Sequence, residues 1–310
     1  ANFAAGNSVW IQSEADALSY AGHKKGEIVT VLSVSSDTIN INGVFADSYT
    51  VATTAQAGVI AMKENIQYIN PMITNRKWAS AKTTPTSSMI RGDFVRNLSI
   101  TGGVLAKNNA AAFLTINCVD VKMHNVTARD LRDNTGLDIF GYGVEAGGAT
   151  IGMQITGCTF ERCRHGVTTG TANIGPTPNY GVQRGITVSG CTAIDCTAAS
   201  FDTHEDSDGV TISGNTVTRG AIVGIATRSY RTTISGNTIT GVAGNGIYCD
   251  SSSLDTTISG NTVSNCRKTD DTVNGRGHGI YITGPQTSVS GNLITDCDNF
   301  GVYVGNTGAA

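Results

Sequence analysis

The chain has 310 residues, and charged side chains make up only 15% of them, well below the roughly 25% of an ordinary soluble protein. The formal net charge is −3 and apolar residues account for 39%, so a sizeable core can form, while nucleic acid is disfavoured as a main partner. No run of 18 apolar residues occurs, which excludes a membrane-spanning helix. The opening residues ANFAAGNSVW lack an initiator Met and an apolar signal segment, which is typical of a processed or excised piece.

The first 60 residues lie outside the repeat that dominates the rest of the chain. The segments GEIVTVLSV (26–34) and TININGVFADSYTV (38–51) are rich in strand-forming residues. We therefore expect residues 1–60 to form an irregular β region that leads into the solenoid of residues 61–310 and packs on it. No Pro/Ser-rich linker separates the two parts, so a single domain is expected.

A short motif recurs along the rest of the chain. It reads ITGCTF at 155, VSGCTA at 188, ISGNTV at 212, ISGNTI at 234, ISGNTV at 258 and VSGNLI at 289. The starts are 33, 24, 22, 24 and 31 residues apart. A base period of 22 to 24 with occasional longer steps indicates one structural coil per repeat, with loops inserted on one side.

Each repeat is built from short strands without helices. Apolar and polar residues alternate within GVTISGNTV, the Gly-Asn pair predicts a bend, and a further short strand such as GIATR or GIYCD follows. Leucine-rich repeats are excluded by the missing Leu framework, and a propeller blade needs about 40–45 residues. The chain is therefore predicted to be all-β, a parallel β-helix, and right-handed because strand crossovers prefer that hand.

Two further columns support this register. One column holds Cys158, Cys191, Asn215, Asn237, Asn261 and Asn292, and the other holds Cys163, Cys196, Gly220, Val242, Cys266 and Cys297. Stacked Asn side chains at a bend can hydrogen-bond along the solenoid axis. Cys residues that share a column with Val and Gly behave as small buried apolar groups, so free thiols are expected, with disulfides between coils as the alternative.

The further strands of successive repeats align on an inward-facing column: Val144, Val167, Phe201, Ile225, Ile247, Ile280 and Val302. Alternation makes the next residue of each strand face outward, namely Glu145, Thr168, Asp202, Ala226, Tyr248, Tyr281 and Tyr303. Two positions later the outward residues are Gly147, Gly170, His204, Arg228, Asp250, Thr283 and Gly305.

The segment SFDTHEDSDG (200–209) is unusually rich in charge for this chain. The alignment makes its first half an outward-facing strand and EDSDG its exit, with Asp202 and His204 on one rung. Arg228 is expected one rung above His204, and Asp250 one rung further. Glu145 lies two rungs from Asp202, about 9.6 Å at the usual strand spacing. Asp, His and Arg on neighbouring rungs favour a site over a merely solvated surface, and Gly147 and Gly170 are expected to leave its wall open.

Several other residues are candidates for the same groove. His165 either reaches it or caps its own strand, Glu205 and Asp250 add carboxylates, and Tyr248 and Tyr281 offer aromatic contacts to a sugar. We assign Glu205, His165, Tyr248, Asp250 and Tyr281 to substrate binding. No metal site or cofactor is assigned, although Asp206 and Asp208 could bind calcium together with Asp202 or Asp250, because hard cations prefer clustered carboxylates.

The coil pattern from about residue 60 to 310 resembles the right-handed β-helix of pectate-lyase-like proteins. Its long coils and polar faces, together with the segment GEIVTVLSV…FADSYTV before the solenoid, are similar to phage tailspike and appendage depolymerases. This resemblance implies a virion-tail or extracellular protein that acts on a bacterial exopolysaccharide, capsule or O-antigen. It also implies a homotrimer, which would protect the open ends of the solenoid from unwanted pairing.

A second resemblance is local. FDTHE (201–205) is similar to the active-site motif of mannuronan C-5 epimerases, with Asp202, His204 and Glu205 at matching positions. That family usually has Pro where Thr203 stands and Tyr where Ala199 stands, which puts an identical mechanism in doubt.

The cluster predicts proton abstraction beside a uronate carboxylate. Arg228 would neutralise the carboxylate, and His204, oriented by Asp202, would remove the C5 proton. Tyr248 would act as the acid or as a stacking platform. The predicted activity is therefore a polysaccharide lyase that cleaves by β-elimination.

Three alternatives stay open. An inverting glycoside hydrolase would use two carboxyl groups, such as Glu145 and Asp202, or Asp202 with Glu205 or Asp250. A uronate C5 epimerase would return the proton instead of eliminating. A non-catalytic glycan-binding spike would use the tyrosine column as a binding ladder.

Overall fold

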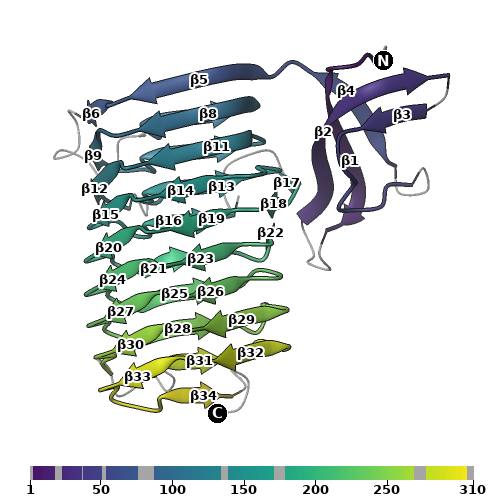
Figure 1. Cartoon of the computed structure of the whole chain (residues 1–310). Coiled ribbons are helices and arrows are strands. Elements are labelled where there is room, and N and C mark those ends of the chain that lie inside the picture. The colour runs from purple at the N-terminus through teal and green to yellow at the C-terminus, as the bar shows by residue number, and fades with distance from the viewer. Residues whose placement is uncertain are drawn as a thin grey trace.

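The computed structural model describes residues 3–17, 23–36, 38–50, 54–75, 87–133, 139–170, 179–268 and 277–305. The described residues form strands and connecting turns, and none of their segments is a helix long and apolar enough to cross a membrane. Figure 1 shows a tall stack of rungs from β5 to β34, with a separate small sheet beside its first rungs.

Three parallel sheets run the length of the stack, and each coil contributes one strand to each sheet. The first solenoid sheet contains β5 (Lys63–Ile69), β8 (Val95–Thr101), β11 (Val119–His124), β14 (Gln154–Thr156), β19 (Thr187–Ser189), β23 (Thr211–Ser213), β26 (Thr233–Ser235), β29 (Thr256–Ser259) and β32 (Thr287–Ser290). The second contains β6 (Met72–Thr74), β9 (Val104–Asn108), β12 (Thr127–Leu131), β15 (Thr159–Glu161), β20 (Thr192–Ile194), β24 (Thr216–Thr218), β27 (Thr238–Thr240), β30 (Thr262–Ser264) and β33 (Leu293–Thr295).

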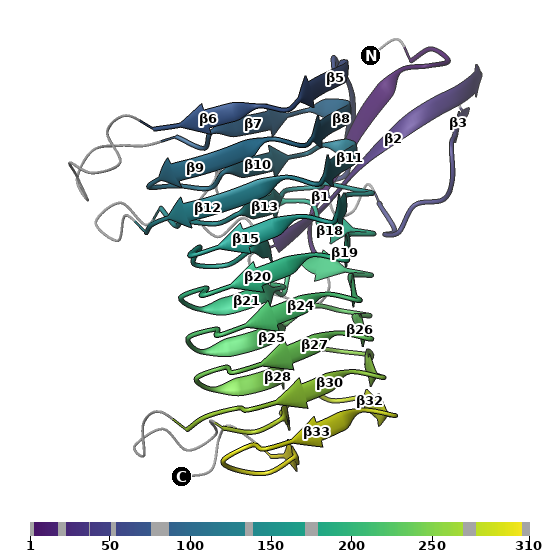
Figure 2. The same cartoon turned by 60° about the vertical axis from the view of Figure 1, so that its left-hand side comes forward.

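The third solenoid sheet contains β7 (Ile90–Asp93), β10 (Phe113–Ile116), β13 (Val144–Gly147), β16 (Val167–Thr169), β21 (Ala199–Asp202), β25 (Val223–Thr227), β28 (Asn245–Cys249), β31 (Ile280–Ile282) and β34 (Val302–Val304). A short pair, β18 (Gln183–Arg184) and β22 (Ser207–Asp208), extends two of the coils. Figure 2 shows the chain turning from the second to the third sheet, for example from β20 into β21 and from β24 into β25. This architecture confirms the predicted parallel β-helix.

The bend between the first and second sheets explains the recurring Gly-Asn pair. Its glycines have φ near +60° (Gly214 +62°, Gly236 +63°, Gly260 +63°), a left-handed conformation that costs most other residues energy. The Asn that follows is buried and takes part in a continuous ladder: Asn237 Oδ1 accepts from Asn215 Nδ2 at 3.0 Å, and Asn237 Nδ2 donates to Asn261 Oδ1 at 2.9 Å. Asn292 continues the ladder at 2.9 Å, so the predicted stacking is confirmed.

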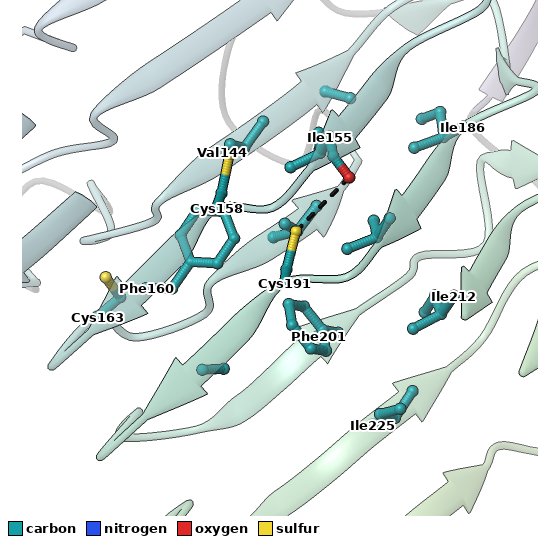
Figure 3. Packing of buried hydrophobic residues seen from close by; sticks show 14 of the residues in the cluster. Val144, Ile155, Cys158, Phe160, Cys163, Ile186, Cys191, Phe201, Ile212 and Ile225 are labelled. Atoms are coloured by element: carbon teal, nitrogen blue, oxygen red, sulfur yellow. Dashed lines mark hydrogen bonds between the residues drawn. The ribbon is translucent and has the colours of Figure 1, made fainter. Parts of the chain in front are cut away.

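The inward-facing residues of the three sheets form one core. Figure 3 shows part of it, where Phe160 and Phe201 meet edge to face with ring centroids 6.3 Å apart and Cys191 Sγ donates to the carbonyl of Ile155 at 3.5 Å. All eight cysteines are free thiols, as predicted. Burying a large apolar side chain of this kind contributes roughly 1.5–3 kcal/mol, so the stack is held mainly by repeated apolar contact.

The N-terminal residues form an antiparallel sheet of β1 (Ser8–Asp16), β2 (His23–Ser35), β3 (Thr38–Ile41) and β4 (Gln56–Ile60), which β17 (Asn179–Tyr180) of the solenoid joins at the edge of β2. Ion pairing also connects the two parts, because Arg184 Nη2 lies 2.8 Å from Asp47 Oδ2. The small sheet therefore contacts the solenoid at the coil that carries β17 and Arg184.

Candidate active site

The third solenoid sheet has the register that the sequence predicts. Strand pairing aligns Val144, Val167, Phe201, Ile225, Ile247, Ile280 and Val302 in one inward column. The next column is Glu145, Thr168, Asp202, Ala226, Tyr248, Tyr281 and Tyr303. Asp202 is the last residue of β21 and stands in the middle of this sheet, where local alternation turns it away from the core.

Three basic side chains surround the Asp202 carboxylate. Arg228 Nη2 donates to Asp202 Oδ2, His204 Nε2 lies 3.3 Å from the same oxygen, and His165 Nε2 lies 3.5 Å from it. Arg228 Nη2 is also 3.2 Å from His204 Nε2. Because the Asp202 side chain is only 1% exposed, the surrounding basic groups must supply the stabilisation that water would give a surface carboxylate.

The charges within this cluster are unequal. Burial alone would raise the pKa of Asp202, but His165, His204 and Arg228 together hold it well below its usual range. Burial lowers the pKa of His165 against the opposing effect of Asp202, so this ring is not a permanent positive charge. We therefore take Arg228 as the permanent positive partner of an ionised Asp202.

His204 lies just beyond the end of β21 and is fixed by its backbone. Its N–H donates to Thr169 Oγ1 at 2.8 Å, and its carbonyl accepts from Ser207 Oγ at 2.6 Å. Gly170, with φ +115°, allows this close approach, because a Cβ at that position would lie 3.0 Å from the Cβ of His204. The His204 side chain is 25% exposed and Arg228 is 31% exposed, so both are accessible to a ligand.

Three expectations about the groove are wrong. Asp202 and Glu145 face away from the core as predicted but are buried rather than open to solvent, and Gly147 and Gly170 are buried too, so they leave no open wall. The segment EDSDG is not only an exit, because Ser207 and Asp208 form β22 and pair with β18. Extra backbone and side chains packed around this sheet cover positions that strand alternation alone assigns to solvent.

His165 joins the cluster instead of capping its strand. Its Nδ1 lies 2.5 Å from the carbonyl of Ala199, and its ring stacks on Tyr142 with centroids 5.2 Å apart. Sequence reasoning missed Tyr142. It precedes Gly143 as His165 precedes Gly166, so the same alignment extended by one column toward the N-terminus pairs the two rings.

Glu145 lies on β13, two strand pairings away from Asp202 through Thr168. Burial raises the pKa of Glu145 to about 8, with a further rise from Asp206 and a smaller opposing effect from Arg91. This carboxyl group is thus protonated at neutral pH, while Asp202 is ionised. Two carboxyl groups whose surroundings drive their pKa values apart form a possible acid–base pair.

The tyrosines and Asp250 occupy the coils on the C-terminal side of the cluster. The Tyr248 hydroxyl donates to Asp250 Oδ2 at 2.7 Å, and burial together with this bond raises the pKa of Tyr248 to about 12. The rings of Tyr248 and Tyr281 stack on each other with centroids 5.3 Å apart. Their facing surfaces are therefore occupied by each other, which leaves ring edges and hydroxyl groups for a ligand.

The remaining acids of the segment face different partners. Glu205 Oε2 lies 3.8 Å from His204 Nδ1, and its side chain is 21% exposed. Gln183 Nε2 donates to Asp206 Oδ2 at 3.1 Å, and Asp208 is paired with Arg231. Within the described ranges, no group of three or more His, Cys, Asp or Glu side chains is arranged to hold a metal ion.

Comparison with known proteins places the fold in context. Residues 84–263 and 142–310 match the family described as the right handed beta helix region. A stretch of 72 residues is 36% identical to a capsule K1-specific depolymerase of Klebsiella phage K64-1, which amounts to 23% of this chain and 8% of that protein.

Two solved tailspikes share the architecture. The tailspike gp61 of Pseudomonas phage phi297 superposes with a TM-score of 0.69 at 15% identity, over 100% of this chain and 56% of that one. The Gp54 tailspike of Acinetobacter baumannii bacteriophage AP22, solved with an A. baumannii capsular saccharide, gives 0.56 at 14% identity, over 99% and 58%. The chain spans just over half the length of these tailspikes and a small part of the depolymerase. The family matches extend over well more than half of the sequence, and together with the stacked parallel rungs they show that the chain belongs to the right-handed β-helix family.

Proposed function

We propose that this chain is the glycan-degrading solenoid of a phage tailspike, carried on the virion tail and acting outside the bacterial cell on an acidic surface polysaccharide. Its substrate would be a capsule, an exopolysaccharide or an O-antigen. The proposal is supported by the partial identity to a capsule depolymerase and by the tailspike architecture. The single observation that carries the site is the buried, ionised carboxylate of Asp202, which is held among Arg228, His204 and His165. Two of these three side chains, Arg228 and His204, are accessible to a ligand.

The proposed reaction is β-elimination at a uronate. With the His204 proton on Nε2, both His204 and Arg228 donate to Asp202, which fixes the ring and leaves Nδ1 as the base. His204 Nδ1 takes the C5 proton, the electron pair forms the C4–C5 double bond, and the C4–O bond breaks. The departing glycosidic oxygen takes a proton from solvent. Arg228 stabilises the charge that builds on the uronate carboxylate through Nη1, since Nη2 contacts Asp202 and Nε donates to the Thr203 carbonyl at 3.4 Å.

Product analysis tests this reaction. Purified bacterial polysaccharides would be incubated with the protein, and products followed by ultraviolet absorbance and mass. Unsaturated uronate ends without added water are expected, and the chelator EDTA should leave the rate unchanged because no cofactor takes part. Inversion at C5 without cleavage would identify an epimerase, and binding without any product would identify a glycan-binding spike.

An inverting hydrolase is the second candidate, favoured by the protonated Glu145. Two rung spacings of about 4.8 Å separate it from Asp202, about 9.6 Å in all, close to the roughly 6.5–9.5 Å between carboxyl groups of inverting enzymes. Glu145→Gln distinguishes the two reactions. On the elimination mechanism it should change the rate by less than about threefold, whereas loss of the acid in a hydrolase should cost about 10²–10⁴-fold. Water incorporated into saturated products would establish the hydrolase.

We also propose that the protein assembles as a homotrimer with its solenoids side by side. The proposal is supported by the resemblance to tailspike depolymerases and by the need to protect sheet edges from unspecific pairing. Light scattering should give a mass about three times the 32.1 kDa of one chain. A mass of one chain at working concentration would contradict it.

A further inference from the structure

A surface cleft opens beside the proposed base, on the exit side of the third solenoid sheet. Its volume is about 290 Å³, and it is lined by Glu205, Tyr230, the run Ser251–Ser253, Leu254 and Pro285. Glu205 connects the cleft to the catalytic cluster, because its carboxylate lies 3.8 Å from His204 Nδ1. This volume is near the lower end of ordinary small-molecule sites, roughly 300–1,000 Å³, and suits a short piece of glycan.

The lining comes from successive coils. Glu205 follows β21, Tyr230 follows β25, the serines follow β28 and Pro285 follows β31. Three rung spacings of about 4.8 Å give the cleft a length of roughly 14 Å along the solenoid axis. A glycan lying along that axis with its cleaved unit at His204 would place the neighbouring sugar in this cleft.

The polar groups of the cleft are suited to sugar hydroxyls. Asp250 Oδ1 accepts hydrogen bonds from Ser252 N at 3.0 Å and from Ser252 Oγ at 2.8 Å, which fixes the serine run. Ser253 Oγ donates to the carbonyl of Thr227 at 2.6 Å. Ser253 is fully buried, whereas the hydroxyls of Ser251 and Ser252 are accessible and keep acceptor lone pairs, and the Glu205 carboxylate accepts only. Leu254 and Pro285 supply apolar surface for the C–H groups of a sugar ring.

The charge of the cleft is opposite to what an acidic sugar needs. Glu205 is a lining carboxylate, Asp250 lies directly behind the serines, and none of the described lining residues is Lys, Arg or His. The nearby Arg228 is bound to Asp202 and also attracted by Glu205 and Asp250. A uronate in the cleft would place two carboxylates together without a compensating cation, which is unfavourable in a partly desolvated site.

We propose that this cleft is a binding subsite for a neutral sugar residue next to the cleaved uronate on the C-terminal side of the site. This inference rests on the proposed function and narrows its substrate class. The glycan is a heteropolysaccharide in which neutral sugars separate the uronates, and polyuronates are poor substrates.

Matched monosaccharides test the subsite without any turnover. Methyl glycosides of glucose, galactose and mannose would be titrated against the corresponding methyl uronides, which differ only by a carboxylate in place of the C6 hydroxymethyl group. The ¹³C-methyl NMR signals of Leu254 report occupancy of the cleft. At low ionic strength at least one neutral sugar should shift these signals, and its uronide should bind about tenfold more weakly, a difference of about 1.4 kcal/mol.

Glu205→Gln should remove most of this discrimination by strengthening uronide binding. Glu161→Gln is the matched control, since Glu161 is also partly buried, with 30% of its side chain exposed, but pairs with Arg162 at the second sheet, and it should leave the ratio unchanged. Equal or tighter uronide binding by the wild type, an unchanged ratio in Glu205→Gln, or no shift of Leu254 with any neutral sugar would overturn the subsite. Cleft binding without glycan cleavage would instead refute the proposed function and leave the subsite standing.

Discussion

Two groups of polar side chains are buried in the same solenoid, and they are built in different ways. The asparagine ladder at the bend between the first and second sheets repeats in four successive coils, from Asn215 to Asn292, and its members are joined by Nδ2-to-Oδ1 hydrogen bonds along the axis. The Asp202 cluster on the third sheet occurs once. Its Oδ2 is crowded by three basic groups, while its buried Oδ1 has no hydrogen-bond partner among the described residues.

The contrast between a repeated and a single polar group indicates which one stabilises the fold and which one serves function. A polar group that repeats with the coil can be satisfied by its own copies, so it stabilises the fold. A polar group that occurs once must be satisfied by unlike neighbours, and an unsatisfied buried oxygen destabilises the protein unless function retains it. We therefore expect substitutions in the ladder to affect unfolding, and substitutions in the cluster to affect activity.

His204→Ala should have the largest effect. It removes the proposed base, and glycan cleavage should fall by about 10²–10⁴-fold, the usual contribution of general base catalysis. The side chain is partly exposed and outside the core, so the circular dichroism spectrum and the unfolding midpoint should stay close to wild type. Near-full activity of this variant would show that the cluster is not the catalytic centre.

Asn237→Ala should show the opposite behaviour. It removes the acceptor of the Asn215 N–H and Nδ2 groups and the side-chain donor to the Ile212 carbonyl, while Asn261 Oδ1 keeps only the Asn237 backbone N–H. The free energy of unfolding in urea should fall by about 2–4 kcal/mol. Activity measured well below the unfolding transition should be unchanged.

Asn292→Ala is the control within the ladder. Asn292 is the last of the four stacked side chains and is only partly buried, so a smaller loss of stability is expected. An unfolding free energy equal to wild type in Asn237→Ala would mean that the ladder does not stabilise the solenoid.

Glu145 should make stability depend on pH. Its pKa is raised from about 4.3 in the unfolded chain to about 8 in the folded protein, so between these values the folded state holds a proton that the unfolded state has lost. Stability therefore falls as pH rises through this window, by up to about 1.4 kcal/mol per pH unit, and levels off above the folded pKa.

Glu145→Gln should abolish that slope. Urea unfolding at several pH values would measure it, with the wild type losing stability relative to the variant toward alkaline pH. Parallel curves for the two proteins would show that Glu145 is ionised in the folded state, and would remove the main support for the hydrolase.

Arg228→Lys should have a smaller effect on activity than His204→Ala. The Lys ammonium can keep a positive charge near Asp202, but it cannot bind Asp202 and a uronate carboxylate with separate nitrogens of one planar group. A loss of about tenfold in kcat/KM is expected, equivalent to about 1.4 kcal/mol. Kinetics on the cleaved glycan would measure it, and unchanged kcat and KM would restrict Arg228 to a structural role.

The fold was predictable because it is periodic. The spacing of ITGCTF, ISGNTV and their copies gave the coil length, and alternation placed Phe201 inward and Asp202 outward in the correct column. The approach of Asp202, His204 and Arg228 followed from the same register. Each of these inferences needs only local geometry, repeated many times.

Burial around the site was not predictable in this way. Alternation predicts which way Glu145 points, but not that other parts of the chain cover it and raise its pKa. Tyr142 and His165 stack just before β13 and β16 of the third sheet. Their positions depend on the segments that precede these strands, and those segments differ in length from coil to coil.

The sequence by itself determined the strand register, the inward and outward columns and the asparagine ladder, because a repeated motif constrains every coil that carries it alike. Only the tertiary structure decided which outward groups are buried, which proton states they hold and where the cleft beside His204 opens. Those properties depend on contacts of single, non-repeating residues with distant segments, and such contacts set the local solvation and charge from which the chemistry follows.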